Sequence, residues 1–270
     1  MRFAVVGHVE WVEFARVESV PRQGTIVHAR ESWEEPAGGG AVSAVQLARL
    51  AGHCDFFTAV GDDEHGRLSI EHLESLGVRV HSVTRDRPTR RAFTYVDDMG
   101  ERTITTIGER ISPNIEDTLP WWSLANADAV LFIAGDAGAL RAARLARTLV
   151  ATTRVLPVLR EGGVELDALV GSAHDPGEAY VDGELDPAPR VVVRTEGAAG
   201  GECTPGGRFE AAPLPGPVVD AYGCGDAFVA GLTYGLGLAI PRQEALAIAA
   251  RCGAAALTGR GAYASQLRQA

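Results

Sequence analysis

The sequence predicts an α/β fold in which a central, mostly parallel sheet carries helices on both faces and a small β-sheet lies beside it as a lid. Short apolar segments alternate with helical segments along most of the chain, a pattern typical of a parallel sheet covered by helices. Residues 10–34 and 88–107 break that alternation with hairpin patterns. We therefore expect a single domain over residues 1–270, with these two segments forming its lid.

The first half of the chain opens the alternation. β-branched and aromatic residues favour a strand within residues 3–14. A glycine-rich turn at residues 36–40 then leads into a helix of small residues that ends at Gly52. The elements expected after the opening strand are a helix over residues 41–50, a strand over 54–60, a helix over 66–76 and a strand from Val78.

The second half continues the same pattern. A lid hairpin over residues 92–96 and 102–105 turns at residues 97–100. The elements expected beyond it are a strand over residues 129–133, a helix over 137–150, a strand over 155–159, a strand over 190–195, and a hairpin region with a loop over 200–217. Strand and helix thus alternate again, which favours parallel pairing.

The composition excludes several classes of protein. A hydrophobic content of 46% is enough for a large buried core. The formal net charge is −10, and the basic residues are too scattered for a nucleic-acid footprint. The chain contains no lysine, so all 25 basic residues are arginine. A Walker A loop, a protein-kinase site and a Schiff-base enzyme each need a lysine, and all three are excluded.

The expected location is the cytoplasm. The four cysteines are far apart and show no CxxC spacing, so neither a zinc site nor a disulfide scaffold is indicated. The segment from Met1 reaches Gly7 too early for a signal peptide, and the apolar run at residues 227–240 is shorter than the roughly 20 residues of a membrane span. We expect free thiols and no membrane or nucleic-acid partner.

The clearest chemical signal is a small-residue turn that runs into an apolar helical segment at residues 220–228. At a helix N-terminus, the backbone amides of Gly223, Cys224 and Gly225 would form an anion hole, because unpaired N–H groups and the helix dipole both favour negative charge. Asp226 in the same turn can accept a proton from a hydroxyl held against a phosphoryl group. Taken alone, Asp226 could equally be a helix N-cap.

This turn resembles the C-terminal signature of the ribokinase-like (pfkB-type) carbohydrate kinases, Asp-Thr-x-Gly-Ala-Gly-Asp, with matches at Asp220, Gly223, Gly225 and Asp226. The resemblance extends along nearly the whole chain in the family's order. The other matching segments are the glycine motif at residues 38–41, Gly61-Asp62-Asp63 with Gly66, the lid strand at 100–104, Thr195-Glu196-Gly197, and the loop at 258–262 with Ser265. Each match is weak by itself, but six in order are a specific signal.

The resemblance implies an ATP-dependent kinase that phosphorylates a hydroxyl of a small sugar-like or nucleoside-like substrate. Asp226 is the implied general base, and the amides of Gly223, Cys224 and Gly225 would stabilise charge on the phosphoryl group. The implied ATP contacts are Ser172, Thr195, Gly197, Gly223, Gly225 and Cys252. Mg²⁺ would arrive with ATP and be held through water near Asp175. The implied potassium site comprises Asp220, Ala256, Gly261 and Ser265. Pairing of the lid strands would form a homodimer.

The substrate side departs from the family pattern. The resemblance implies substrate contacts at Gly38, Gly39, Gly40 and Asp226 and at two polar anchors, but Val12 replaces the usual Asp and Val42 the usual Asn. Glu10 lies on the same strand face as position 12, so we expect it to supply the missing carboxylate. The alternative is that Glu10 is a solvated lid residue. With two valines at these anchors, we expect a more apolar pocket than a ribose or fructose site.

Other functions remain open at this point. The segment Ser172-Ala173-His174-Asp175 replaces the family's Asn-x-x-Glu, so metal dependence is expected to be altered. Together with the two valines, this change allows a kinase-fold protein that binds a ligand or regulates without phosphotransfer. A nicotinamide-dependent oxidoreductase has a similar alternation, but the opening strand lacks its GxGxxG fingerprint. The retained Asp226 and its glycines favour the kinase.

Overall fold

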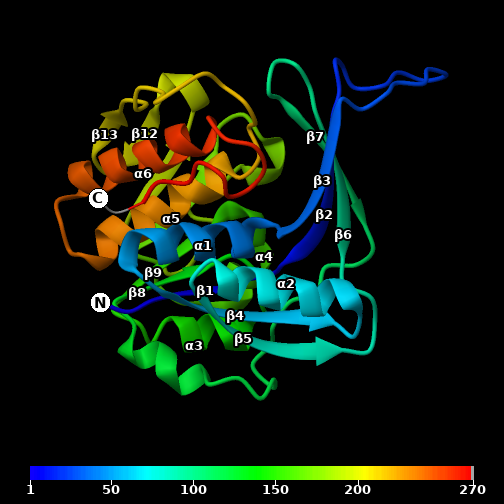
Figure 1. Cartoon of the computed structure of the whole chain (residues 1–270). Coiled ribbons are helices and arrows are strands. Elements are labelled where there is room, and N and C mark those ends of the chain that lie inside the picture. The colour runs from blue at the N-terminus through cyan, green and yellow to red at the C-terminus, as the bar shows by residue number, and fades with distance from the viewer. Residues whose placement is uncertain (269–270) are drawn as a thin grey trace.

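The computed structural model describes residues 1–268 and shows a large sheet between layers of helices, with a smaller sheet standing to one side (Figure 1). The large sheet has the strand order β13-β12-β11-β10-β9-β8-β1-β4-β5. Its strands are β1 (Phe3–Val6), β4 (Cys54–Gly61), β5 (Val78–Arg85), β8 (Ala129–Phe132), β9 (Thr148–Thr152), β10 (Ala168–Ser172), β11 (Val192–Thr195), β12 (Gly201–Thr204) and β13 (Gly207–Phe209). Neighbouring strands from β5 to β11 pair in parallel, and β12 and β13 add an antiparallel edge. The predicted fold class is therefore confirmed.

Helices cover both faces of this sheet. The α-helices are α1 (Gly39–Ala51), α2 (Glu64–Ser75), α3 (Ala137–Ala143), α4 (Leu156–Gly162), α5 (Cys224–Gly237) and α6 (Arg242–Ala256). Strand β1 shows why the core is so apolar: Phe3 and Val5 pack into one hydrophobic cluster, with α1 and α5, whereas Ala4 and Val6 pack into another, with α3. A strand buried on both faces reads as a continuous apolar run. None of the helices formed by residues 1–268 has the length and apolar character that a membrane span requires.

The middle of the chain differs from the sequence prediction. The strand expected over residues 155–159 is wrong, because this stretch is helical and forms a 3₁₀ turn (Thr153–Val155) followed by α4. The helix expected over residues 137–150 ends at Ala143, and β9 and the unpredicted β10 complete the sheet. Short apolar runs fit a buried strand or a buried helix equally well, so their periodicity could not decide between them.

The smaller sheet forms the lid and has the strand order β3-β2-β6-β7. Its strands are β2 (Glu10–Arg16), β3 (Glu31–Ala37), β6 (Arg91–Val96) and β7 (Arg102–Ile107). The two hairpins are antiparallel, and β2 pairs in parallel with β6. The opening strand predicted over residues 3–14 is therefore divided between the two sheets, with Gly7 at the crossing. In Figure 1 the loop between β2 and β3 extends beyond the body of the protein.

Asp63 links the start of α2 to the segment that leads into the lid strand β6. One oxygen of its carboxylate accepts hydrogen bonds from Gly66 N at 2.9 Å and Thr89 Oγ1 at 2.6 Å, and the other accepts from Thr89 N at 2.8 Å. Asp63 is thus the N-cap of α2 and also holds the segment that enters β6. A Cβ on Gly61 would lie 2.2 Å from Thr89 N, so that position requires glycine.

We expect Asp63→Ala to lower the free energy of unfolding by about 2 kcal/mol, because it removes a helix cap and leaves the Thr89 amide without its acceptor. Urea denaturation followed by circular dichroism measures the change. The adjacent Asp62 is exposed, so Asp62→Ala is the matched control and should change stability by less than about 0.5 kcal/mol. Equal effects of the two substitutions would contradict this role for Asp63.

Candidate active site

The predicted turn lies at the N-terminus of α5, as the sequence indicated. Gly223 has φ 74°, a left-handed conformation that favours glycine, and the helix begins at Cys224. The first intrahelical hydrogen bond runs from Ala227 N to Gly223 O at 2.8 Å. The amides before Ala227 therefore have no partner from an earlier turn of the helix. A Cβ built on Gly225 would meet nothing within 4 Å, so there is open space beside this glycine.

Asp226 lies in the first turn of α5 and faces the glycine turn at the start of α1. A Cβ on Gly39 would lie 2.8 Å from Asp226 Oδ1, so a side chain at position 39 would occupy the space in front of the carboxylate. Burial raises the pKa of Asp226 to about 6, against the opposing effect of Arg102 and Arg154, while Glu178 and Glu10 raise it further. A carboxylate with this pKa is suited to accept a proton near neutral pH.

The same glycine turn brings Glu10 close to Asp226. A Cβ on Gly38 would lie 3.2 Å from the His8 ring and 3.3 Å from Glu10 Cγ, and a Cβ on Gly40 would lie 2.5 Å from His8 O. The turn is held from the α5 side, because Gly38 N donates to the Tyr222 hydroxyl at 3.2 Å. Glu10 and Asp226 therefore lie on two sides of one turn, near the carboxyl ends of the parallel strands, where α/β proteins commonly bind ligands.

Glu10 belongs to a buried charged group rather than to the solvated lid surface. Its side chain is 8% exposed, and its Oε1 lies 3.1 Å from Arg90 Nη1 and 3.5 Å from His8 Nε2. Burial raises the pKa of Glu10, and Arg90 and Arg110 oppose that effect. Burial, followed by the same two arginines, lowers the pKa of His8 to about 3, so its imidazole is neutral.

Both valines are packed within the protein. Val12 is fully buried in the core, and Val42 packs behind Gly223, where a Cβ would lie 2.9 Å from Val42 Cγ1. Glu10, Arg90 and the neutral His8 form a polar group on the Glu10 side of the glycine turn. The more apolar pocket stays a prediction.

The predicted nucleotide contacts lie in two different places. Ser172 and Thr195 are paired positions at the ends of β10 and β11, and Gly197 follows with φ 59°. Cys252, in contrast, is fully buried and packs against Gly231, where a Cβ would lie 2.8 Å from its sulfur. This packing between α5 and α6 leaves the Cys252 side chain no surface for a ligand.

Glu178 is a site residue that the sequence analysis missed. Its Oε2 accepts from Ser172 N at 2.7 Å, and its Oε1 lies 2.7 Å from Arg154 Nε. The predicted metal residue Asp175 lies at the outer side of Arg154, with Oδ2 2.6 Å from Nη2. Glu178 raises the pKa of Asp226. The sequence contained one sign of this residue, because Glu178 is acidic and lies three positions after Asp175.

The residues of the predicted cation loop form two separate sets of hydrogen bonds. Asp220 is fully buried, and its carboxylate accepts from Tyr222 N at 2.8 Å and Gly261 N at 2.9 Å. Ser265 Oγ lies 3.2 Å from Ala256 O in the adjacent segment. Burial raises the pKa of Asp220, and these backbone hydrogen bonds oppose that effect. A buried carboxylate fits a hard cation, which would compensate its charge.

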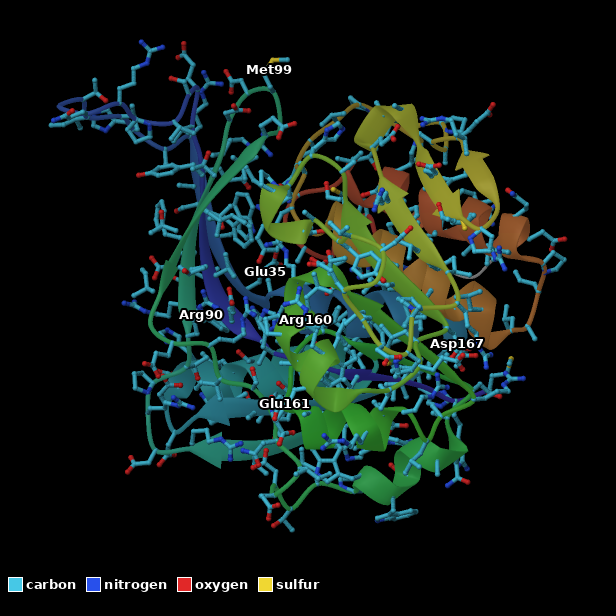
Figure 2. All side chains as sticks on the ribbon, turned by 180° about the vertical axis from the view of Figure 1, so that it is seen from behind. Glu35, Arg90, Met99, Arg160, Glu161 and Asp167 are labelled. Atoms are coloured by element: carbon cyan, nitrogen blue, oxygen red, sulfur yellow. The ribbon has the colours of Figure 1, made fainter. Side chains whose placement is uncertain are left out.

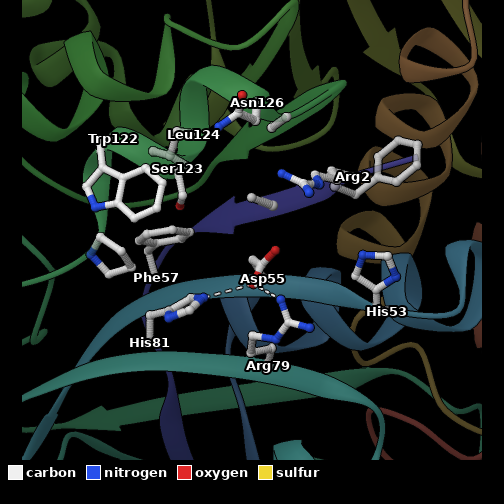
Figure 3. Close-up of a pocket in the computed structure, with 14 residues that line it drawn as sticks. Arg2, His53, Asp55, Phe57, Arg79, His81, Trp122, Ser123, Leu124 and Asn126 are labelled. Carbon is white, nitrogen blue, oxygen red and sulfur yellow. Dashed lines mark hydrogen bonds and ion pairs between the residues drawn. The ribbon is translucent and has the colours of Figure 1, made fainter.

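A second hollow lies at the opposite, amino end of the strands (Figure 3). It has a volume of about 420 Å³ and is lined by the starts of β1, β4 and β5. Asp55 pairs there with His81 at 2.8 Å and with Arg79 at 3.3 Å, and the hydrogen bond from His81 contributes most to lowering the pKa of Asp55. Asp55, His81 and Arg79 thus pair with one another in this hollow. The hollow lies at the other end of the strands from Asp226.

Comparison with known proteins identifies relatives along the whole chain. The profile of the pfkB family carbohydrate kinases matches residues 2–157 and 164–269. An ATP-dependent ribose-1-phosphate kinase of Halopiger xanaduensis is 29% identical over 255 residues, covering 86% of this chain and 83% of that protein. A fructokinase of Klebsiella pneumoniae is 30% identical over 277 residues, covering 84% of this chain and 87% of that protein.

Solved structures share the fold. A ribokinase from Cryptococcus neoformans in complex with ADP has a TM-score of 0.76 at 23% identity, covering 98% of this chain and 96% of that one. A ribokinase from Thermotoga maritima has a TM-score of 0.77 at 21% identity, covering 99% of this chain and 96% of that one. At this level of identity the likeness establishes the architecture.

The raised pKa of Asp226 predicts a pH-dependent effect on stability. Its ionisation opposes folding above the folded-state pKa of about 6 and has no effect below the ordinary value of 3.8, where the carboxyl is neutral in both states. We expect Asp226→Asn to raise the free energy of unfolding at pH 8 by about 1–2 kcal/mol, and to leave it unchanged near pH 3.5. Urea unfolding at both pH values tests this, with the exposed Asp62→Asn as control. Destabilisation at pH 8 would contradict it.

Proposed function

Because the chain belongs to the pfkB family of carbohydrate kinases, we propose that its cleft transfers the γ-phosphoryl group of ATP to a hydroxyl of a small sugar or sugar-like molecule, with Asp226 as the general base. The observation that carries this proposal is the position of Asp226. Its carboxylate shares the first turn of α5 with unpaired backbone amides and faces the glycine turn beside Glu10. A base and an anion-binding site are thus adjacent, as phosphoryl transfer requires.

The proposed step follows from this geometry. The acceptor hydroxyl gives its proton to Asp226, and its oxygen forms a bond to the γ-phosphorus. The bond between that phosphorus and the bridging oxygen breaks, and ADP leaves. The amides of Gly223, Cys224 and Gly225 would stabilise the negative charge on the moving group. Glu10, held by Arg90, would accept hydrogen bonds from the substrate's other hydroxyls.

ATP is proposed to bind along the ends of β10 and β11. Thr195 is the last residue of β11 and pairs with Ser172, and Gly197 follows it; the family resemblance implies phosphate contacts at Thr195 and Gly197. The Cryptococcus ribokinase, which has a related fold, was described in complex with ADP, and this supports binding of a nucleotide. Cys252 is not included, because it is buried.

Two cations are proposed to assist. Mg²⁺ would arrive with ATP and neutralise charge on its phosphates. Glu178 rather than Asp175 is proposed to hold its water, because Glu178 Oε2 accepts from Ser172 N and its charge raises the pKa of Asp226. K⁺ would bind at the loop formed by Asp220, Ala256, Gly261 and Ser265. There it would compensate the buried Asp220 carboxylate and stabilise the turn that begins α5.

The lid is proposed to mediate a homodimer. Every residue of β7 is exposed, and Ile104 and Ile107 in it are 42% and 43% exposed. An edge strand with exposed apolar side chains is suited to pair with a second copy of itself.

Removing the proposed base should abolish turnover. We expect Asp226→Asn to lower kcat by about 10²–10⁴-fold, because the acceptor hydroxyl loses its proton acceptor. With the native enzyme, kcat/KM should rise as pH increases through about 6 and then level off, since Asp226 must be ionised to act. Coupled ADP-release assays with a panel of sugars, sugar phosphates and nucleosides measure both. Undiminished turnover by Asp226→Asn would remove this mechanism, whereas Asp62→Asn should retain full activity.

The cation loop gives a separate expectation. Initial rates in KCl should exceed those in choline chloride at equal ionic strength by about tenfold. This factor corresponds to a gain of about 1.4 kcal/mol when K⁺ offsets the buried charge of Asp220. Asp220→Asn should remove this dependence. Equal rates in both salts would exclude a functional cation at this loop.

A further inference from the structure

The lid sheet contacts the segment that leads into α5. Ala221 N donates to Gly100 O, in the turn between β6 and β7, at 2.8 Å. Arg16 Nη2, at the end of β2, donates to Val219 O at 3.0 Å. The segment that enters the proposed phosphate-binding turn is therefore held by hydrogen bonds from two parts of the lid.

Strand β3 of the lid contacts a second segment, the loop at residues 260–263. The Tyr263 hydroxyl donates to Pro36 O at 2.5 Å. The loop passes so close to the strand that a Cβ on Gly261 would lie 2.9 Å from Trp33 Nε1. Gly261 also has φ 66°, so this position requires glycine. The loop and β3 are thus packed against each other.

Glu35 of β3 binds this loop through a backbone amide. Its Oε1 accepts from Ala262 N at 2.7 Å, and a Cβ on Gly261 would overlap the same oxygen. The Glu35 side chain therefore lies directly against the loop backbone. Figure 2 shows Glu35 between the lid sheet and the rest of the protein. A lid side chain thus holds a segment that belongs to the main body.

Asp220 joins the same loop to the turn at the start of α5. Its Oδ2 accepts from Gly261 N at 2.9 Å, and its Oδ1 accepts from Tyr222 N at 2.8 Å. Asp220 and Glu35 therefore hold consecutive amides of the loop from two different elements. Tyr222 directly precedes Gly223, the N-cap of α5. A continuous series of hydrogen bonds thus runs from β3 to the proposed phosphate-binding turn.

We propose that Glu35 is a positioning residue: by holding the loop at residues 260–263 it fixes Asp220 and, through Asp220, the turn whose amides act on the phosphoryl group. Glu35 acts through these contacts and does not touch the reacting atoms. Donors that stabilise charge in a transition state are effective when they are already aligned, so a loosened turn slows transfer more than it weakens binding. This inference rests on the proposed function.

Hydrogen exchange resolved at single amides tests this role without turnover. The hydrogen-bonded amides of Ala221 and Tyr222 report on the turn, and Leu149 N, which is hydrogen-bonded in the main sheet, reports on global stability. We expect Glu35→Ala to speed exchange at Ala221 and Tyr222 by about tenfold or more, because local opening becomes more frequent. Leu149 should stay within about twofold of its native rate. The Ala262 amide loses its acceptor in any case, so it is not diagnostic.

Further variants separate the hydrogen bond of Glu35 from its charge. Glu35→Gln keeps an oxygen that can accept from Ala262 N, so exchange in the turn should stay within about threefold of the native rate. Glu35→Asp keeps the charge but is one methylene shorter, so it should behave like Glu35→Ala. The Gln and Asp variants decide the question even if Glu35→Ala does not fold.

Glu34→Ala is the matched control. Glu34 is the preceding residue of β3, and its Oε2 accepts a hydrogen bond of the same length, 2.7 Å, from Trp11 Nε1 within the lid. Glu34→Ala therefore removes a comparable contact of the lid that does not reach the loop, and it should leave exchange in the turn unchanged. An equal effect of Glu34→Ala and Glu35→Ala would contradict a specific role for Glu35.

Steady-state kinetics give a second readout. Glu35→Ala should lower kcat by about tenfold while KM for ATP stays within about twofold, because the aligned amides act mainly on the transferring group. Glu35→Gln should recover most of the lost kcat. Coupled ADP-release assays measure both constants, with the sugar or nucleoside of the panel that the native protein phosphorylates fastest.

The outcomes separate this inference from the proposed function. Native exchange rates at Ala221 and Tyr222 in Glu35→Ala, acceleration that includes Leu149 equally, or a Glu35→Gln protein as impaired as Glu35→Asp would each overturn the role of Glu35. If such a result accompanies phosphoryl transfer that depends on Asp226, the kinase stands without this link. If exchange responds as expected but the native protein phosphorylates no member of the panel, the link stands and the proposed reaction fails.

Discussion

The close backbone packing at the start of α1 is the constraint on which the arrangement of Glu10 and Asp226 depends. A Cβ on Gly7 would lie 2.9 Å from the Gly40 backbone, and one on Gly39 would lie 2.8 Å from Asp226. Because these positions have no side chains, three segments can converge: the crossing from β1 to β2, the N-terminus of α1 and the N-terminus of α5. That convergence puts a carboxylate from the lid strand and a carboxylate from the helix on either side of one turn.

The electrostatics of the cleft follow from the use of arginine throughout. Glu10, Glu178 and Asp226 are interleaved with Arg90, Arg102 and Arg154. A lysine in such partly desolvated surroundings readily loses its proton, whereas a guanidinium stays charged. The chain has a net charge of −10, yet these three guanidinium groups keep their positive charge beside the carboxylates.

Much of the fold and part of the site could be predicted from local patterns. The alternation of strand and helix, the two lid segments and the glycine turn before Asp226 are each continuous in sequence. The predictions failed where a local pattern has two solutions. The apolar run at residues 155–159 became helical, and the helix predicted through Val150 gave way to β9, since burial suits either structure. Cys252 was buried by the packing of α6 on α5, which no local pattern reveals.

The sequence by itself determined the fold class, the absence of lysine-dependent chemistry and the segment that carries Asp226, because each is written in neighbouring residues. Only the tertiary structure decided that Glu10 is buried beside Arg90, that Glu178 accepts from Ser172 N, and that Val12 is buried in the core. These contacts join segments far apart in the chain. Their formation depends on how two sheets and their helices pack, and that packing is a property of the whole chain rather than of any single motif.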